Sequence, residues 1–389
     1  MISNSIQPKI IDNQSHLDSV ISELHNVSSY AIDTEFHREK TYYPRLALIQ
    51  IRWDDSIAII DPLVVNLEGF SSVFQSDIPV IFHAGSQDLE VLLRAVGQVP
   101  RKIFDTQIGA GFIGMRTPSL AALHETLLGI KLAKGDRLTD WFQRPLSENQ
   151  LEYAASDVRY LLDVHQKLVH ELEDRNRLEW AESEFQLFLD KRQKVVEPIN
   201  AWLKIKEAKH LSKKARGVAQ ALAEWRENAA RRSDIPPRYV LSDLALIGIA
   251  QRMPKKASDL SNIRGVDAKQ FHGNKASSLL RIVADGLSRD VKKPASKSQN
   301  NLKTELRPAV TLLSAWLSQY ASDNDIDPAL LGTRSDIEGL LRGDENPRLA
   351  EGWRHAEVGS PIAQLLNGKA TLAFSNGRLI LEERITEPL

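Results

Sequence analysis

The segment Tyr30-Ala31-Ile32-Asp33-Thr34-Glu35-Phe36 places two carboxylates at the end of an apolar run. A run of this kind predicts a β-strand, and residues two apart on a strand project to the same face of the sheet. Asp33 and Glu35 would therefore bring two negative charges into one small volume, which is costly unless a cation or a proton compensates them. A solvated edge would explain an isolated pair. The apolar character of this strand instead favours a central position in a sheet.

The surrounding sequence predicts a mixed sheet with a crossover helix. Short β-rich runs at 46–51, 57–60, 80–82 and 103–105 are bounded by polar or proline-containing turns. The apolar residues of 88–96 recur at helical spacing, so a helix should connect the last two strands. From about residue 118 the pattern is helical, with one long helix expected over 148–175. We expect an α/β domain over residues 1–200.

The second half of the chain contains an internal repeat. Trp225 is followed ten residues later by Ile235, and Trp316 is followed ten residues later by Ile326. Each copy then reaches a Ser-Asp pair that can cap a helix, at 242–243 and at 335–336. This pattern predicts two small all-α domains, at 201–290 and 305–389, joined by a polar linker over 291–304.

Composition narrows the class of protein. The chain has 389 residues, of which 42% are hydrophobic and 26% charged, which excludes a disordered protein. It has no cysteine, so disulfides and thiolate metal sites are excluded and any metal must be held by oxygen or imidazole. No apolar run is long enough for a membrane helix, and the first residues do not resemble a secretory signal. We expect a soluble, cytoplasmic protein.

Charge is distributed unevenly along the chain, although the net charge is only -1. Residues 201–300 contain 21 Lys and Arg against 9 Asp and Glu, whereas both flanking blocks are acidic. A basic block of this kind suggests a polyanionic partner, because Lys and Arg gain affinity by displacing counterions from a phosphate backbone. A solvated basic helical surface is the equally simple alternative.

Two further acidic positions stand out by their context. Tyr153 and Asp157 are four residues apart, so on a helix they share one face. Asp88 opens a helix directly after a strand. Each has a structural explanation by itself: Tyr153 could pack inward with Asp157 solvated, and Asp88 could complement the helix dipole.

Taken together, these positions resemble a known family. Asp33-x-Glu35, Asp88 in a His-Ala-Gly-x-x-Asp-Leu context and Tyr153-x-x-x-Asp157 resemble the DEDDy class of 3′→5′ exonucleases. Further motifs look like bacterial ribonuclease D, namely Thr41-Tyr42-Tyr43-Pro44, Asp61-Pro62-Leu63, Phe104-Asp105-Thr106-Gln107 and Asp140-Trp141-x-x-Arg144-Pro145-Leu146. The two helical copies resemble the tandem HRDC-type domains of that family, the second being divergent. The resemblance therefore covers the whole chain.

The resemblance implies an RNase H-like nuclease fold and a two-metal site. It makes Asp33, Glu35, Asp88 and Asp157 ligands of two Mg²⁺ or Mn²⁺ ions, and hard divalent ions do prefer oxygen donors. In such sites the ions activate the attacking water and stabilise the leaving oxygen. Tyr153 would orient that water, since an unaided tyrosine with a pKa near 10 is a poor base at neutral pH.

Other residues are candidates for contacts with RNA. Phe36 and Tyr42 could stack on terminal bases, or belong to the core. His83, Trp141 and Arg144 could contact the substrate, or be structural. The basic residues expected on an RNA-binding surface are Lys213, Lys214, Arg216, Arg231, Arg232, Lys255 and Lys256.

The function expected from the sequence is removal of nucleoside 5′-monophosphates from RNA 3′ ends by a monomeric enzyme. Family resemblance points to transfer RNA precursors as partners. A DNA exonuclease on the same scaffold remains an alternative, because contacts to the 2′-OH leave no motif. A nucleic-acid-binding protein with a decayed nuclease domain is the second alternative, although all four acids and the tyrosine are present.

Overall fold

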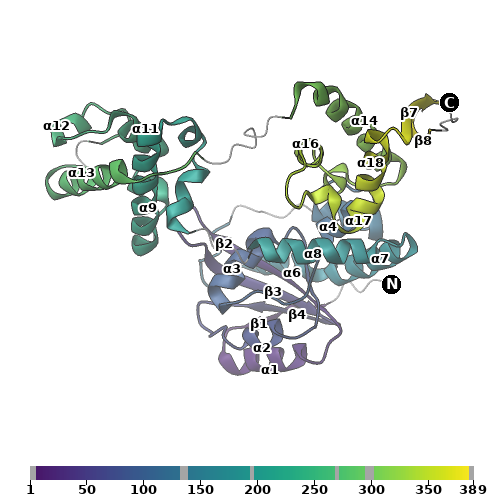
Figure 1. Cartoon of the computed structure of the whole chain (residues 1–389). Coiled ribbons are helices and arrows are strands. Elements are labelled where there is room, and N and C mark those ends of the chain that lie inside the picture. Colours follow the sequence, from purple (N-terminus) through teal and green to yellow (C-terminus); the bar gives the residue numbers. More distant parts are fainter. Residues whose placement is uncertain (1–5, 132–138, 193–196, 268–270, 294–301, 385–389) are drawn as a thin grey trace, which may run out of the picture. The chain divides into compact units, whose positions relative to one another are not determined.

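The computed structural model describes residues 6–131, 139–192, 197–267, 271–293 and 302–384 (Figure 1). The described chain divides into two compact units. The first draws on residues 1–35, 47–193 and 300–389, and the second on 36–46 and 194–299. None of the described helices combines the length and apolar character needed to cross a lipid bilayer.

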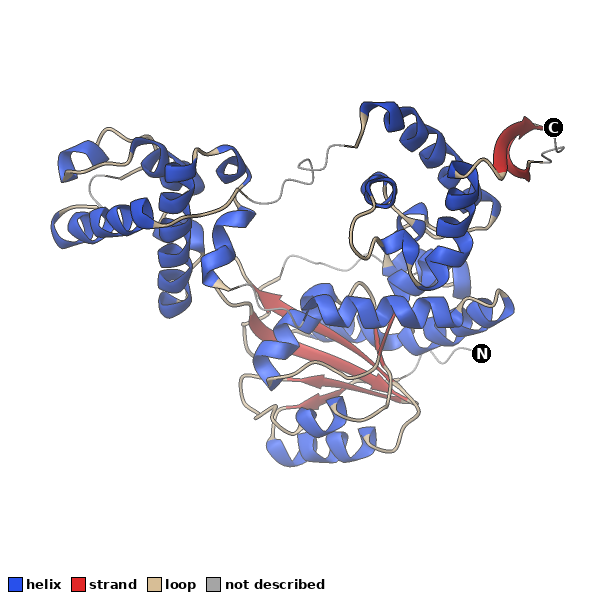
Figure 2. Cartoon of the chain, viewed as in Figure 1, coloured by secondary structure: helices blue, strands red, loops and turns tan. Residues whose placement is uncertain are grey.

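The first unit contains a six-stranded mixed sheet with helices on both sides (Figure 2). Its strands are β1 (Lys9–Ile11), β2 (Tyr30–His37), β3 (Arg45–Trp53), β4 (Ser56–Ile60), β5 (Val80–Phe82) and β6 (Ile103–Asp105). The spatial order is β1-β4-β3-β2-β5-β6. Strands β3 and β4 are antiparallel, whereas β1 is parallel to β4, and β5 is parallel to both β2 and β6. The sequence had predicted all of these strands except β1.

Burial along the two central strands explains where the sheet opens to solvent. Every residue of β3 from Ala47 to Trp53 is buried. Strand β2 is buried through Ile32, and then Asp33 and Glu35 are only partly buried. The two carboxylates therefore lie where a central strand emerges from the core, and not at an outer edge of the sheet.

Helices enclose this sheet. They are α1 (Gln14–Leu24), α2 (Phe70–Phe74), α3 (Ser86–Val96), α4 (Thr106–Gly111), α5 (Leu120–Leu123), the π-helix η1 (His124–Leu128), α6 (Glu148–Arg159), α7 (Leu161–Asp174) and α8 (Leu178–Arg192). The prediction of one long helix over 148–175 is wrong, since α6 ends before Tyr160 and α7 begins after it. At this break the buried guanidinium of Arg52 donates to the carbonyl oxygen of Arg159, the last residue of α6, and bonds Asp163 in the first turn of α7 at 2.5 Å.

The second unit includes the basic helical module expected from the sequence. Its elements are η2 (Pro198–Lys204), η3 (Lys206–His210), α9 (Lys213–Ser233), α10 (Pro237–Val240), α11 (Asp243–Arg252), α12 (Ala257–Leu260) and α13 (Gly273–Ser288). Helices α9 and α13 touch at Gly217 and Gly286, where a Cβ on Gly217 would lie 2.3 Å from the Gly286 carbonyl oxygen. Ser242 caps α11, as the repeat had suggested.

The C-terminal module consists of η4 (Thr304–Leu306), α14 (Arg307–Asp323), α15 (Pro328–Leu331), α16 (Arg334–Arg342), η5 (Arg348–Ala350), α17 (Gly352–Arg354), η6 (His355–Gly359), α18 (Ser360–Leu366), β7 (Ala370–Ser375) and β8 (Arg378–Glu383). The expectation of a purely helical module omits the antiparallel β7–β8 hairpin, which places Leu372, Leu379 and Leu381 against the helical core. The cap of α16 is Thr333, and not the expected Ser335.

This module packs on α8 and on the chain after α4, both of which belong to the first unit. The rings of Trp180 and Trp353 stack with centroids 4.8 Å apart. Beside them, the buried carboxylate of Glu184 bonds the buried guanidinium of Arg354 at 2.5 Å. Arg177 donates to the carbonyl oxygens of Asn324 and Phe112. Aromatic stacking and a desolvated ion pair thus join segments about 170 residues apart in the chain.

Candidate active site

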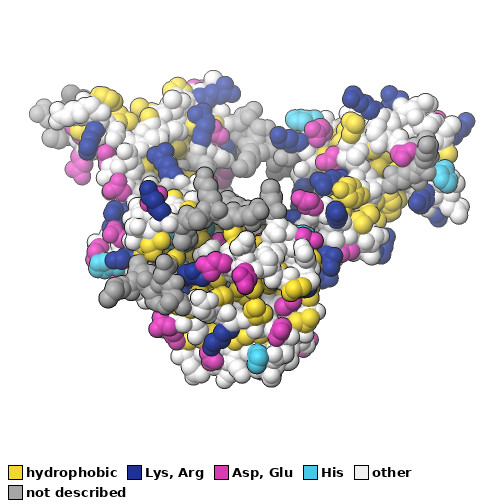
Figure 3. Space-filling view, turned by 180° about the vertical axis from the view of Figure 1, so that it is seen from behind, with side chains coloured by type: hydrophobic (Ala, Val, Ile, Leu, Met, Phe, Trp, Pro, Cys, Tyr) yellow, Lys and Arg dark blue, Asp and Glu magenta, His cyan; other side chains and the backbone are white. Residues whose placement is uncertain are grey.

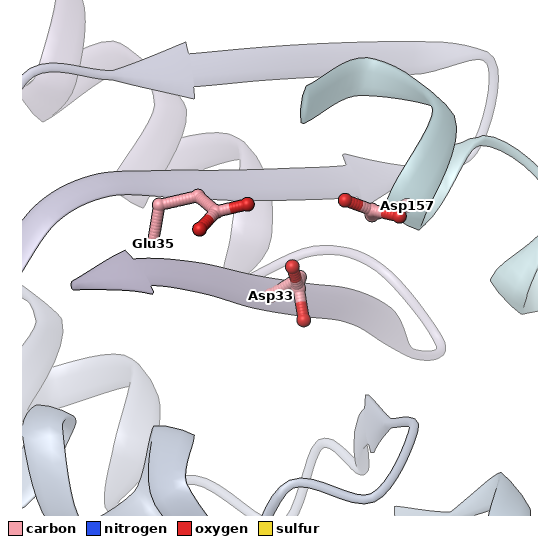
Figure 4. A group of neighbouring side chains, drawn as sticks. All are labelled: Asp33, Glu35 and Asp157. Atoms are coloured by element: carbon pink, nitrogen blue, oxygen red, sulfur yellow. The ribbon is translucent and has the colours of Figure 1, made fainter. Parts of the chain in front are cut away.

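Strand β2 supplies two acidic side chains to one face of the sheet. Because side chains alternate along a strand, Asp33 and Glu35 project together while Thr34 points to the other side. Figure 4 shows both carboxylates directed toward the end of helix α6. Strand β2 therefore places Asp33 and Glu35 on one face, as its sequence had predicted.

Helix α6 supplies the third carboxylate. Its start is defined by a capping box between Ser147 and Gln150. Asp157 lies near its other end, and one oxygen each of Asp33, Glu35 and Asp157 lie within 4.8 Å of one another. Segments more than 120 residues apart in sequence thus place three carboxylates at one point (Figure 4).

The fourth acid, Asp88, is held by Thr34, the residue between Asp33 and Glu35. It lies in the first turn of α3 and is 8% exposed. The backbone N–H of Thr34 donates to its Oδ1 at 3.1 Å, and the Thr34 hydroxyl donates to the same oxygen at 2.5 Å. Asp88 is thereby fixed to the residue between Asp33 and Glu35, close enough for its charge to raise the pKa of both.

A second buried carboxylate positions the turn that carries Asp88. Asp105 accepts hydrogen bonds from the backbone N–H groups of Ala84 and Gly85, which precede α3, and caps α4 through two more. Ala84 has a positive φ of 54°, an uncommon conformation that these bonds help to hold. The motif containing Asp105 was noted in the sequence without a role, and the role of Thr34 had no sequence signal beyond its place between two acids.

The electrostatics of the cluster favour a bound cation. Burial raises the pKa of Asp33 well above its ordinary value, and the charges of Asp88, Asp157 and Glu35 raise it further. Burial also raises the pKa of Glu35 to about 8, with contributions from Asp157 and then Asp88. A divalent ion among these groups would replace protons as the compensating charge, and the oxygen-only donor set suits hard ions such as Mg²⁺ or Mn²⁺.

Tyr153 lies one helical turn before Asp157 on α6, as its spacing predicted. Its ring is partly exposed and packs 5.8 Å from the ring of Trp141, which is only 3% exposed. Trp141 therefore packs against the tyrosine ring, and its own side chain is buried. The helix places the tyrosine hydroxyl and the Asp157 carboxylate on the same face.

Two of the remaining substrate candidates, Arg144 and His83, have protein partners. The Arg144 guanidinium bonds both oxygens of Asp61, at 2.5 and 2.8 Å, and the carbonyl oxygen of Ala47. Burial, and then His124, lowers the pKa of His83 to about 4, so this imidazole carries no charge for a phosphate at neutral pH. Phe36 is partly exposed at the end of β2.

Tyr42 belongs to the second unit. Its hydroxyl donates to Glu227 at 2.5 Å and accepts from Arg231 at 2.9 Å. The backbone N–H groups of Tyr42 and Tyr43 both donate to Asp234. The segment that follows strand β2 is thus anchored on helix α9.

The predicted basic residues fall into two groups. Lys213 pairs with Asp290, Arg216 donates to backbone carbonyls, and Arg231 holds Tyr42. The others are exposed, namely Lys214, Arg232, Lys255 and Lys256. A space-filling view shows Lys and Arg side chains close to hydrophobic ones on the surface (Figure 3).

Comparison with known proteins defines the class of protein. A family model described as 3'-5' exonuclease matches residues 8–173, and one described as HRDC domain matches residues 215–283. The fold and the carboxylate cluster at its central strand thus define a 3′→5′ exonuclease.

Relatives that match nearly the whole chain identify the family. The ribonuclease D proteins of Bartonella henselae and Zymomonas mobilis are each 34% identical to it, covering 95% and 97% of this chain and 93% and 98% of their own. The crystal structure of Escherichia coli RNase D, an exoribonuclease involved in structured RNA processing, matches with a TM-score of 0.84 and 30% identity over 93% of this chain and 99% of that one. The chain belongs to the ribonuclease D family. This confirms the class expected from the motifs, a hydrolytic 3′→5′ exoribonuclease with an α/β nuclease domain followed by HRDC-type helices.

Proposed function

We propose that this exoribonuclease trims the 3′ ends of transfer RNA precursors, releasing nucleoside 5′-monophosphates one at a time, as a monomer in the cytoplasm. Family membership and the exonuclease scaffold support the reaction type. The structured RNA named for the E. coli relative supports a folded precursor as substrate. The basic block of residues 201–300 supports a polyanionic partner.

The acidic cluster is proposed to hold two divalent ions, Mg²⁺ or Mn²⁺. Asp33, Glu35 and Asp157 converge, and Asp88 reaches the same strand through Thr34. When bound, such ions supply an activated water and positive charge opposite the developing charge of the phosphate. The residues of the chain hold the oxygen donors in place before substrate arrives, which lowers the cost of organising them during the reaction.

Tyr153 is proposed to orient the attacking water. It shares a helix face with Asp157, and Trp141 fixes its ring. Because the ordinary pKa of a tyrosine is about 10, its hydroxyl at neutral pH donates and accepts hydrogen bonds and does not remove a proton. Tyr153→Phe keeps the ring contact with Trp141 and removes only the hydroxyl, so it should lower kcat.

One observation supports this function most strongly, the meeting of three carboxylates from two distant segments on a ribonuclease D scaffold. The direct test is a time course on a 3′-extended transfer RNA precursor, with wild type beside Asp33→Asn. Wild type should release nucleoside 5′-monophosphates, EDTA should stop it, and Asp33→Asn should be almost inactive. Retained activity in excess EDTA would contradict the proposal.

Discrimination between RNA and DNA needs a second measurement on matched substrates. Single strands of identical sequence, one RNA and one DNA, should be compared under the same ion concentrations. We expect faster release from RNA. Equal or faster release from DNA would indicate that the enzyme does not read the 2′-OH.

A further inference from the structure

A groove of about 580 Å³ lies within the second unit, lined by residues of η2 and by the chain that follows α13. Its lining includes aliphatic side chains that are unusually exposed, since Ile199 is 43% and Leu203 is 40% exposed. The same lining includes Arg289, Lys292 and Lys293. We call it the η2/α13 groove. It combines apolar and cationic side chains in one lining.

The cations of the groove outnumber its acids. Asp290 is the one acidic residue in the described lining. Its carboxylate accepts a bond from Lys213 at 2.8 Å, and its pKa is lowered first by Lys213 and then by Lys292 and Arg216. Several positive charges therefore act on one exposed point, and a single aspartate does not balance them.

Arg289 has a different role from the two lysines. Its guanidinium bonds Glu224 at 2.6 Å and Asp285 at 2.8 Å, so two carboxylates compensate its charge and fix its position. Lys292 and Lys293, which follow it directly, are exposed. The positive charge available to a ligand thus comes mainly from these two lysines, because the charge of Arg289 is compensated by its own ion pairs.

Stability alone does not account for this concentration of charge. Lys213 begins helix α9, whose first turn contains no acid. A cation at a helix N-terminus opposes the helix dipole and is unfavourable there. Ile199, which is 43% exposed, and Leu203, which is 40% exposed, leave apolar surface in contact with solvent. A ligand that is anionic at one edge and apolar at the other would use both features.

We propose that the η2/α13 groove is a subsite for single-stranded RNA, holding one or two nucleotides without reading their sequence. Phosphates lie toward Lys292 and Lys293, and base faces lie against Ile199 and Leu203. The amide of Gln220 in the same lining can bond base edges. The volume is within the range of about 300–1,000 Å³ typical of small-ligand sites. This inference rests on the proposed function and specifies where RNA is held away from the acidic cluster.

The test measures binding without cleavage, so all variants carry Asp33→Asn. Fluorescence anisotropy follows a labelled oligoadenylate RNA over a series of salt concentrations. Lys292→Gln with Lys293→Gln should make the slope of log K against log salt less negative by about 1.4, because each phosphate contact on a single strand contributes about 0.7. Ile199→Ser should weaken binding several-fold and leave that slope unchanged, since it removes an apolar contact only.

A charge-matched control separates a defined subsite from diffuse attraction. Lys167→Gln with Lys191→Gln removes the same charge from exposed positions on helices α7 and α8 of the first unit and should change the slope less. Equal changes in both pairs, or no change in the groove pair, would overturn the subsite. A vesicle containing phosphatidylserine serves as the alternative anionic surface. The subsite would also be overturned if Lys292→Gln with Lys293→Gln weakened binding to the vesicle but left binding to RNA unchanged. If the wild-type protein did not hydrolyse RNA at all, that result would instead contradict the proposed function.

Discussion

Binding of a divalent ion to the acidic cluster should release protons, and Glu35 sets the magnitude. Burial and the charges of Asp157 and Asp88 raise the pKa of Glu35 to about 8. In the ion-free protein at pH 7 a carboxyl of that pKa is about nine-tenths protonated, and it must lose its proton to become a ligand. Glu35 alone should therefore release about 0.9 proton, and Asp33, whose pKa is also raised, should add to it.

Isothermal titration calorimetry measures this release directly. Mn²⁺ is titrated into the protein in buffers of different ionisation enthalpy, and the slope of observed enthalpy against buffer enthalpy counts the protons. Wild type should release about one proton or more at pH 7, and the share from Glu35 should fall to about 0.1 at pH 9, where that carboxyl is already ionised.

Glu35→Gln is the matched variant, because the amide keeps an oxygen donor of the same shape and cannot titrate. Its proton release at pH 7 should be smaller than that of wild type by about 0.9. A wild-type slope near zero at pH 7 would refute the reasoning, as would a slope that does not change between pH 7 and pH 9. The second comparison needs no variant, so it decides the matter even if Glu35→Gln binds the ion too weakly to titrate.

The same site and the module contact lead to three further predictions. Because the folded-state pKa of Glu35 is raised, its contribution to stability is complete below about pH 4.5 and is lost as pH rises toward 8. The free energy of unfolding, measured with urea in EDTA, should fall by on the order of a few kcal/mol across that pH window, and Mg²⁺ should restore it. A free energy of unfolding that does not change with pH would count against the burial of Glu35. Asp157→Asn should lower turnover by more than the roughly 100-fold typical of losing an outer-shell partner, with circular dichroism unchanged; activity within tenfold of wild type would exclude it as a ligand. Glu184→Ala should cost about 3–5 kcal/mol in urea unfolding, because it leaves the buried Arg354 uncompensated, whereas Glu184→Gln keeps an acceptor and should cost less. Equal costs for the two variants would mean that charge does not matter there.

Much of the site was predictable because its parts are local. Alternation along a strand is enough to place Asp33 and Glu35 on one face, and helical spacing is enough to align Tyr153 with Asp157. Short aliphatic runs predicted five of the six strands of the main sheet for the same reason. These signals depend on backbone periodicity, which a sequence displays directly.

Other features depend on which segments meet, and no local pattern displays that. At the break between α6 and α7, Arg52 bonds the carbonyl oxygen of Arg159, which lies 107 residues further along the chain. Thr34 holds Asp88 across 54 residues, and the contact of Trp180 with Trp353 joins the nuclease region to a module that the sequence presented as separate. The repeat in the chain predicted two similar modules, but not that one of them would pack on α8.

The sequence by itself indicated five strands of the main sheet, the acidic motif, the repeat and the family resemblance. Only the tertiary structure decided how closely the carboxylates approach, which partners hold them, and how far their pKa values move. The physical reason is that desolvation and charge interaction depend on the distance and burial of groups far apart in the chain. Periodicity along the backbone carries no information about either quantity.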